Sequence, residues 1–378
     1  MFLYIIYLVS LLSIIAFSPT RYFSLSYIVL VSAIPGLVYC LVKHPSKIQT
    51  CLLLMFILSI YSGWDNHFQL FEFGRQLSNK EVIASSSIWL LSFIVMKLIL
   101  INRTLQSLHF FKIYIATFFI LGVLVMIGEI LWNNNSLDEG SNSVYYVLPV
   151  LPCFIYCFPK YRYFAMILVV SLIILSIKRS AFLIVAASGI WLIFCSYKGI
   201  IKINKNSFKI LAVITIAFII ISVWGLQYID AIMNRFASIS EDGGSHRDLI
   251  FEYAWELFTQ TNTKQMLFGN GPRFYWYMSS NISATHNDFL EILLSCGIVG
   301  ILLFLYLHTQ LIKMLLTSVR WKMDLAVPMG ICYLTFIIWN MIASQFAYQS
   351  PTVCTFMFIA LAEHIIKNEK DIIYCNKL

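Results

Sequence analysis

Charged residues are scarce in this sequence, and that scarcity excludes an ordinary soluble protein. Only 12% of the 378 residues are charged, whereas 60% are hydrophobic and the mean hydropathy is +0.81. A soluble domain is about half apolar and about a quarter charged. The composition therefore predicts a polytopic membrane protein. The net charge of +8 does not predict nucleic-acid binding, because the basic residues are unevenly distributed along the chain.

Motifs for bound cofactors are also missing from the sequence. It contains no P-loop, no dinucleotide fingerprint and no Asp-x-Asp pair, which argues against an enzyme that uses cytoplasmic nucleotides or nucleotide sugars. No Cys/His spacing suits zinc, and the nine cysteines lie mostly in apolar runs, so we expect core packing rather than disulfides. We expect no metal and no cofactor. Residues 1–17 lack a basic start and a cleavage pattern, which favours a first spanning helix over a signal peptide.

Long apolar runs predict an all-α fold with about twelve transmembrane helices. We expect three groups of segments: nine helices in 1–226, a long outer loop at 227–285, and three helices with a short tail in 286–378. The individual spans are expected near 1–17, 24–42, 48–64, 82–101, 110–132, 144–158, 163–177, 180–197, 208–226, 288–316, 325–343 and 350–366.

The basic residues predict the orientation of the chain. When the N-terminus is placed in the cytoplasm, most of the 26 Lys and Arg residues fall on the cytoplasmic side. The positive-inside rule then places both termini in the cytoplasm and the long loop outside.

The long loop contains a predicted short amphipathic helix. Apolar residues recur at helical spacing over 245–258, and a capping-box pattern from Ser245 to Asp248 starts this helix near His246. Arg247 then falls in the first turn, where the helix dipole favours an anion, so it is a candidate phosphate clamp. The alternative is an ion pair with a nearby acid.

Four other basic residues are candidates of the same kind. Lys178 and Arg179 occupy the turn between two short spans, and the first of these rises only about 22 Å, short of a bilayer core of ~30 Å. A basic residue at that depth suggests an anion partner, with snorkelling to the interface as the alternative. Arg235 and Arg273 are weaker candidates in the long loop.

The polar stretch at 285–291 precedes an apolar run long enough to span a bilayer. A capping-box pattern from Thr285 to Asp288 places His286 in the first helical turn, where the helix dipole disfavours an imidazolium. A neutral imidazole can act as a general base. Asp288 or Glu291 then orients it or binds hydroxyl groups. The alternative for His286 is an ordinary surface position at a helix cap.

Taken in order, these motifs resemble the O-antigen ligase/polymerase superfamily over roughly residues 163–305. The basic turn departs from the family's usual Ser-Arg-Gly. The resemblance rests on Ile177-Lys178-Arg179-Ser180, Asn234-Arg235-Phe236, Ser245-His246-Arg247, Phe268-Gly269-Asn270-Gly271, His286-Asn287-x-x-Leu290 and Gly297-x-x-Gly300.

The resemblance implies a metal-independent glycosyltransferase of the bacterial inner membrane that works at the periplasmic face on a glycan linked to undecaprenyl pyrophosphate. By motif position, Arg179 and Arg247 hold the pyrophosphate and His286 deprotonates the acceptor hydroxyl. The remaining substrate contacts implied are Lys178, Arg235, Arg273, Asn287, Asp288 and Glu291. Membrane lipid and a chain-length regulator are the expected partners, and no nucleic acid is expected.

The same motifs serve polymerases and ligases. We favour an O-antigen polymerase because the chain is short, its spans are very apolar and its motifs match loosely, as suits an enzyme that varies with its glycan. The alternative within the family is a ligase that transfers the glycan to lipid A-core. Outside it, a lipid-linked oligosaccharide flippase would need a charged central cavity, and a scaffold protein would leave Arg179 unexplained.

Overall fold

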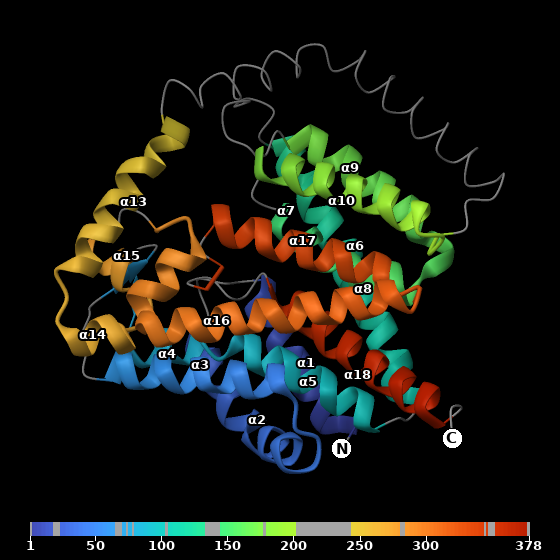
Figure 1. The fold of residues 1–378 in the computed structure, drawn as a ribbon, viewed down its shortest axis with the longest axis horizontal. Coiled ribbons are helices and arrows are strands. Elements are labelled where there is room, and N and C mark those ends of the chain that lie inside the picture. Colours follow the sequence, from blue (N-terminus) through green and yellow to red (C-terminus); the bar gives the residue numbers. More distant parts are fainter. Residues whose placement is uncertain are drawn as a thin grey trace. The chain divides into compact units, whose positions relative to one another are not determined.

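The structure is a computed structural model of the chain. It describes residues 2–17, 23–64, 70–72, 75–77, 79–102, 105–132, 144–176, 179–201, 243–279, 284–343, 345–346 and 352–375. Its elements (Figure 1) are α1 (Phe2–Phe17), α2 (Phe23–Lys43), α3 (Lys47–Trp64), β1 (Leu70–Glu72), β2 (Arg75–Leu77), α4 (Asn79–Ser85), α5 (Ile88–Asn102), α6 (Leu105–Trp132), α7 (Val144–Val147), α8 (Leu151–Cys157), the 3-10 turn η1 (Pro159–Tyr161), α9 (Arg162–Ser176), α10 (Arg179–Tyr197), α13 (Gly243–Thr259), α14 (Thr263–Phe268), α15 (Phe274–Met278), α16 (Asp288–Arg320), α17 (Ala326–Ile342) and α18 (Val353–Cys375).

The predicted helical class is confirmed in the described residues, apart from one short antiparallel hairpin formed by β1 and β2. Among these residues, four helices are long and apolar enough to cross a membrane, or five if the bent pair of α8 and the helix after it is one span. Four shorter apolar helices accompany them. A membrane protein with several spans is therefore supported, while the number twelve stays a prediction. The expected span at 208–226 lies outside the described residues.

Two predicted spans are each divided into shorter helices. The span at 82–101 breaks between α4 and α5 at three consecutive serines, whose hydroxyls donate to the carbonyl oxygens of Val82, Ile83 and Ala84 at 2.6 Å. Such local bonds compete with a continuous helix. The span at 144–158 becomes α7 and α8, and the chain then bends by 115° before α9. Pro159 follows the C-cap Phe158 of α8, and its ring and missing N–H prevent that helix from continuing.

The chain packs as two compact units. The first comprises Met1–His109, Arg247–Met314 and Trp339–Leu378, and the second comprises Phe110–His246 and Leu315–Ile338. These units are defined by packing, whereas the predicted segments describe how the chain crosses a membrane. The units therefore do not coincide with the segments, and the segments remain predictions.

In the second unit, aromatic side chains fix the helices against one another. Phe119 of α6 stacks on Phe154 of α8 with ring centroids 4.3 Å apart. Trp191 of α10 donates its indole N–H to the Ala326 carbonyl at 3.1 Å. The same ring covers Gly330 so closely that no Cβ would fit there. Residues far apart in sequence thereby hold α10 against α17.

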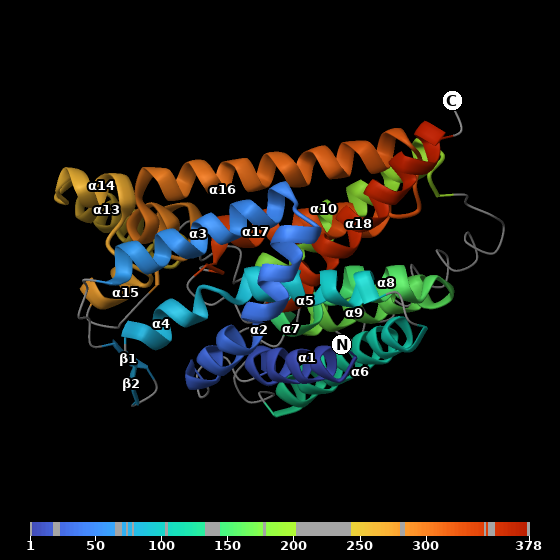
Figure 2. The same cartoon turned by 90° about the horizontal axis from the view of Figure 1, so that it is seen from below.

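In the first unit, α3 runs beside α16 (Figures 1 and 2). The Cys51 thiol lies 3.1 Å from the Leu303 carbonyl, and the Ser59 hydroxyl lies 3.5 Å from the thiol of Cys296. Of the eight cysteines whose side chains the structure describes, seven are buried and Cys157 is half-buried, so the expectation of core packing is confirmed for them.

Trp89 of α5 joins two further helices of this unit. Its ring stacks on Phe356 of α18 with centroids 4.8 Å apart and lies 6.4 Å from Phe304 of α16. Its N–H donates to the Thr352 hydroxyl at 2.6 Å. The indole therefore meets a polar partner although it is buried.

Helix α16 is sharply broken at Gly297, which has φ 69° and ψ −167°. In a straight helix, positions 289 and 304 would lie about 22 Å apart along the axis. Instead, the ring of Phe289 lies 5.3 Å from that of Phe304 and 6.0 Å from that of His308. The predicted span at 288–316 falls within this candidate membrane helix, but it is not one straight helix: residues 288–296 fold back along the segment from 298 to 320. That segment is still about 34 Å long and sufficient to span a bilayer.

Candidate functional site

The structure places six of the nine predicted site residues in the first unit: Arg247, Arg273, His286, Asn287, Asp288 and Glu291. Lys178 and Arg235 lie outside the described residues. Arg179 is the first residue of α10 in the second unit, and its side chain is outside the described part of the chain. The geometry of the site is therefore described for the six residues of the first unit.

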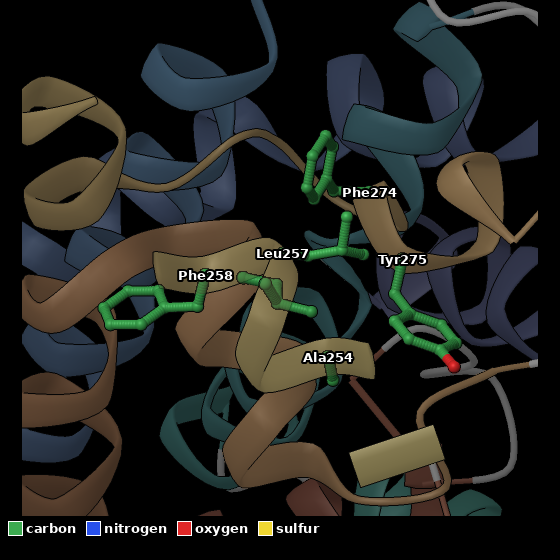
Figure 3. Packing of buried hydrophobic residues seen from close by; sticks show 6 residues of the cluster. Ala254, Leu257, Phe258, Phe274 and Tyr275 are labelled. Atoms are coloured by element: carbon green, nitrogen blue, oxygen red, sulfur yellow. The ribbon is translucent and has the colours of Figure 1, made fainter. Parts of the chain in front are cut away.

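Helix α13 confirms the predicted amphipathic helix of the long loop, with one correction. It begins at Gly243, so Ser245 lies inside the helix instead of capping it. Its buried face packs on α15 and on the folded-back part of α16 (Figure 3); the cluster consists of Ala254, Leu257, Phe258, Phe274, Tyr275 and Leu294. Burial of such apolar side chains fixes the helix on this surface. Arg247 is half-buried and lies two helical turns before Ala254, the first buried residue of that face.

The turn at Gly269-Asn270-Gly271, after α14, docks onto the break in α16. The N–H groups of Asn270 and Gly271 donate to the carbonyls of Leu294 and Ser295 at 2.9 and 3.0 Å. Because Gly297 interrupts the helical ladder, the preceding turn has carbonyls that need other donors, and the loop supplies two of them. Gly269 has φ 86° and faces the Ser295 carbonyl so closely that a side chain would not fit. This is the close approach that only glycine permits.

His286 lies just before α16, not in its first turn as predicted. The helix begins at Asp288, and its N-cap is Asn287, whose Oδ1 accepts from the N–H groups of Phe289 and Leu290 at 2.9 and 3.2 Å. His286 itself has φ 50°, in the left-handed region. A neutral imidazole was expected because His286 was placed in the first helical turn. The structure removes that reason. The conformation is uncommon outside glycine, although histidine adopts it more readily than most residues.

The two acids of the segment are buried and face inward. Asp288 is fully buried, and its Oδ1 accepts from the N–H of Phe346 at 2.7 Å. Glu291 is 1% exposed, and its carboxylate oxygens lie 3.1 Å from the hydroxyls of Thr285 and Ser295. The predicted contacts of these acids with a sugar are replaced, in this conformation, by contacts with the protein.

Arg273 is also buried, at 2% exposure, and occupies the N-cap position of α15 with φ 61°. Its backbone N–H donates to Glu291, and its guanidinium attracts the same carboxylate. The residue therefore faces an internal acid instead of presenting a surface clamp for phosphate.

One further polar pair of this unit was missed at the level of sequence. His308 is buried at 5% exposure, and its Nε2 lies 3.3 Å from the amide nitrogen of Asn340. A histidine inside a long apolar run was the signal that could have identified it. Among the described residues, no three His, Cys, Asp or Glu side chains form a group suited to a metal ion.

Substituting Asp288 with alanine is expected to destabilise the protein by about 1–3 kcal/mol, because the buried N–H of Phe346 loses its acceptor. Asp288→Asn retains one side-chain oxygen and is expected to lose less. Thermal unfolding of the purified variants in detergent, followed by tryptophan fluorescence, measures the difference. Equal midpoints for Asp288→Ala and the wild type would show that this N–H group does not depend on the carboxylate.

Comparison with known families identifies the part of the chain that contains these motifs. Residues 164–305 match the sequence profile of a family described as O-antigen ligase. The match runs from α9 into α16 and includes the basic turn, α13 and the His286 segment. The resemblance to the O-antigen ligase/polymerase superfamily is thus confirmed over these residues. No curated protein matches the chain.

Proposed function

From the O-antigen ligase match of residues 164–305, we propose that this chain is an O-antigen polymerase of the bacterial inner membrane. It transfers a glycan from undecaprenyl pyrophosphate to a lipid-linked repeat unit at the periplasmic face. The observation that carries the proposal is the order of three motifs inside the match: the basic turn, the loop helix with Arg247, and the segment with His286. A short, very apolar chain with loosely matched motifs favours the polymerase. The ligase is the second candidate, because the matching family carries that description.

The reaction requires a base and an anion site. His286 accepts the proton of the acceptor hydroxyl, whose oxygen attacks the anomeric carbon of the donor sugar. The bond from that carbon to the pyrophosphate oxygen breaks, and undecaprenyl pyrophosphate leaves with the electron pair. Arg247 stabilises this departing charge. A similar role for Arg179 rests on motif position alone. Neither a metal nor a nucleotide is required, and a chain-length regulator is the proposed protein partner.

Two features of the structure support a rigid environment for His286, the proposed base. The left-handed backbone at this residue persists only when the surrounding structure determines it, and such strain is concentrated at functional sites. Helix α13 is docked on the same part of α16 through the apolar cluster around Leu257. Both features support a site built on the folded-back segment of α16.

A deletion strain tests the function through its surface polysaccharide on a gel. Loss of a polymerase leaves single repeat units on the acceptor, whereas loss of a ligase or a flippase leaves none. An unchanged ladder would exclude a role in glycan assembly. Plasmids carrying Arg247→Ala or Arg179→Ala are expected not to restore the ladder, while Arg320→Ala, an exposed arginine at the end of α16, is the matched control and restores it.

A further inference from the structure

We infer that Glu291 is a positioning residue that holds the backbone at His286 in its left-handed conformation. The inference rests on the proposed function, in which His286 is the base. Glu291 does not contact His286 in any bond described above, and its action passes through Thr285, the residue before His286.

The Glu291 carboxylate joins three segments of the chain. It receives the Thr285 hydroxyl from the turn before α16, and that of Ser295 from the next turn of the same helix, each at 3.1 Å. From the loop before α15 it receives the Arg273 N–H and the attraction of the guanidinium. A buried carboxylate with partners of this kind fixes the geometry of its neighbours, since each hydrogen bond is strong away from water.

Two residues at or next to these contacts, Arg273 and His286, share an unusual backbone conformation. Among the described residues other than glycine, positive φ occurs at Arg273, His286 and Lys322. Arg273 is itself a partner of Glu291, and His286 directly follows its partner Thr285. One buried acid therefore stands between two of the three strained positions, which is expected if it determines both conformations.

His286 is held from its other side as well. Asn287 caps α16 with its Oδ1, and its Nδ2 lies 3.4 Å from the Met341 carbonyl. The hydroxyl of Thr285 also lies 3.0 Å from the Asn287 carbonyl, so it closes the turn around His286. With both flanking residues held, the path of the chain through His286 depends on the contact between Thr285 and Glu291.

A base needs this kind of support, because a misplacement of about 1 Å can lower the rate roughly 100-fold. A purely structural role for Glu291 would instead lower the amount of folded protein and leave each folded molecule fully active. The two roles differ in the turnover number of folded enzyme, which can be measured.

The test compares Glu291→Gln, Thr285→Val and Thr285→Ser with the wild type in liposomes. The substrate is the lipid-linked repeat unit extracted from cells that lack the chain. For the first two variants, we expect kcat to fall at least about 10-fold, with KM changed by less than about twofold. Thr285→Ser, which keeps the hydroxyl, is expected to retain near wild-type kcat. Glu252→Gln on the exposed face of α13 is the control and is expected to be unchanged.

The inference is overturned if both Glu291→Gln and Thr285→Val keep kcat within about twofold of the wild type. It is also overturned if their losses vanish after correction for the folded fraction. Thr285→Val exchanges the hydroxyl for a methyl group and so removes its contacts with both Glu291 and the Asn287 carbonyl, whereas Glu291→Gln leaves the second contact in place. His286→Ala in the same assay separates the two ideas. An inactive His286→Ala beside an active Glu291→Gln removes the positioning role alone, whereas an active His286→Ala removes the proposed base.

Discussion

Replacement of His286 with alanine is expected to abolish chain extension at unchanged protein levels. General base catalysis contributes about 10²- to 10⁴-fold to a rate, and a loss of that size leaves only single repeat units on a gel. His286→Asn is the sharper variant, because asparagine also tolerates the left-handed backbone observed at this position. Its loss of activity would be due to the missing imidazole and not to the backbone.

The control for this pair is His109→Ala, an exposed histidine near the start of α6. We expect its ladder to match the wild type. The ladder of each variant is compared at equal amounts of membrane protein, measured by immunoblotting of a tag. If His286→Asn produced full-length chains at the wild-type rate, the segment before α16 would not supply the base.

Gly297→Ala is expected to cause the largest loss of stability. A Cβ at this position would lie 2.5 Å from the backbone of Leu267 and 2.6 Å from the nitrogen of Gly269. In addition, the conformation at Gly297, φ 69° and ψ −167°, is essentially restricted to glycine. Strain and overpacking together cost roughly 2–6 kcal/mol, a large part of the stability of a typical protein. Thermal unfolding in detergent and the yield of purified protein measure the effect.

Gly189→Ala in α10 is the matched control, because a Cβ there has nothing within 4 Å. Alanine favours a helix over glycine by up to about 1 kcal/mol, so this variant is expected to be as stable as the wild type or slightly more so. A Gly297→Ala protein that unfolded at the wild-type temperature would show that the loop after α14 does not need its close approach to α16.

Much of the fold was predictable because its signals are local. Apolar runs identified α3, α9, α10 and α17, and helical periodicity identified α13 inside the long loop. The two glycines that flank Asn270 favour the turn that follows α14. The order of short motifs also led to the family later found over residues 164–305. In each case the information lies within a few tens of residues.

The environment of the site could not be predicted in the same way. The pattern at Gly297 and Gly300 indicates helix packing, but a pattern does not specify that a helix folds back. The capping pattern from Thr285 to Asp288 predicted a cap at Thr285, but Asn287 provides the cap. Local patterns of this kind allow more than one start for a helix, and long-range contacts select among them.

The sequence by itself determined that this is an apolar helical chain with a polar, histidine-bearing segment before its last long helices. Only the tertiary structure decided what surrounds that segment. It buried Asp288 against the backbone of Phe346 and placed Glu291 between Thr285 and Arg273. The physical reason is that a charged side chain can be buried only where distant segments supply its partners. Those partners are fixed by the folding of the whole unit.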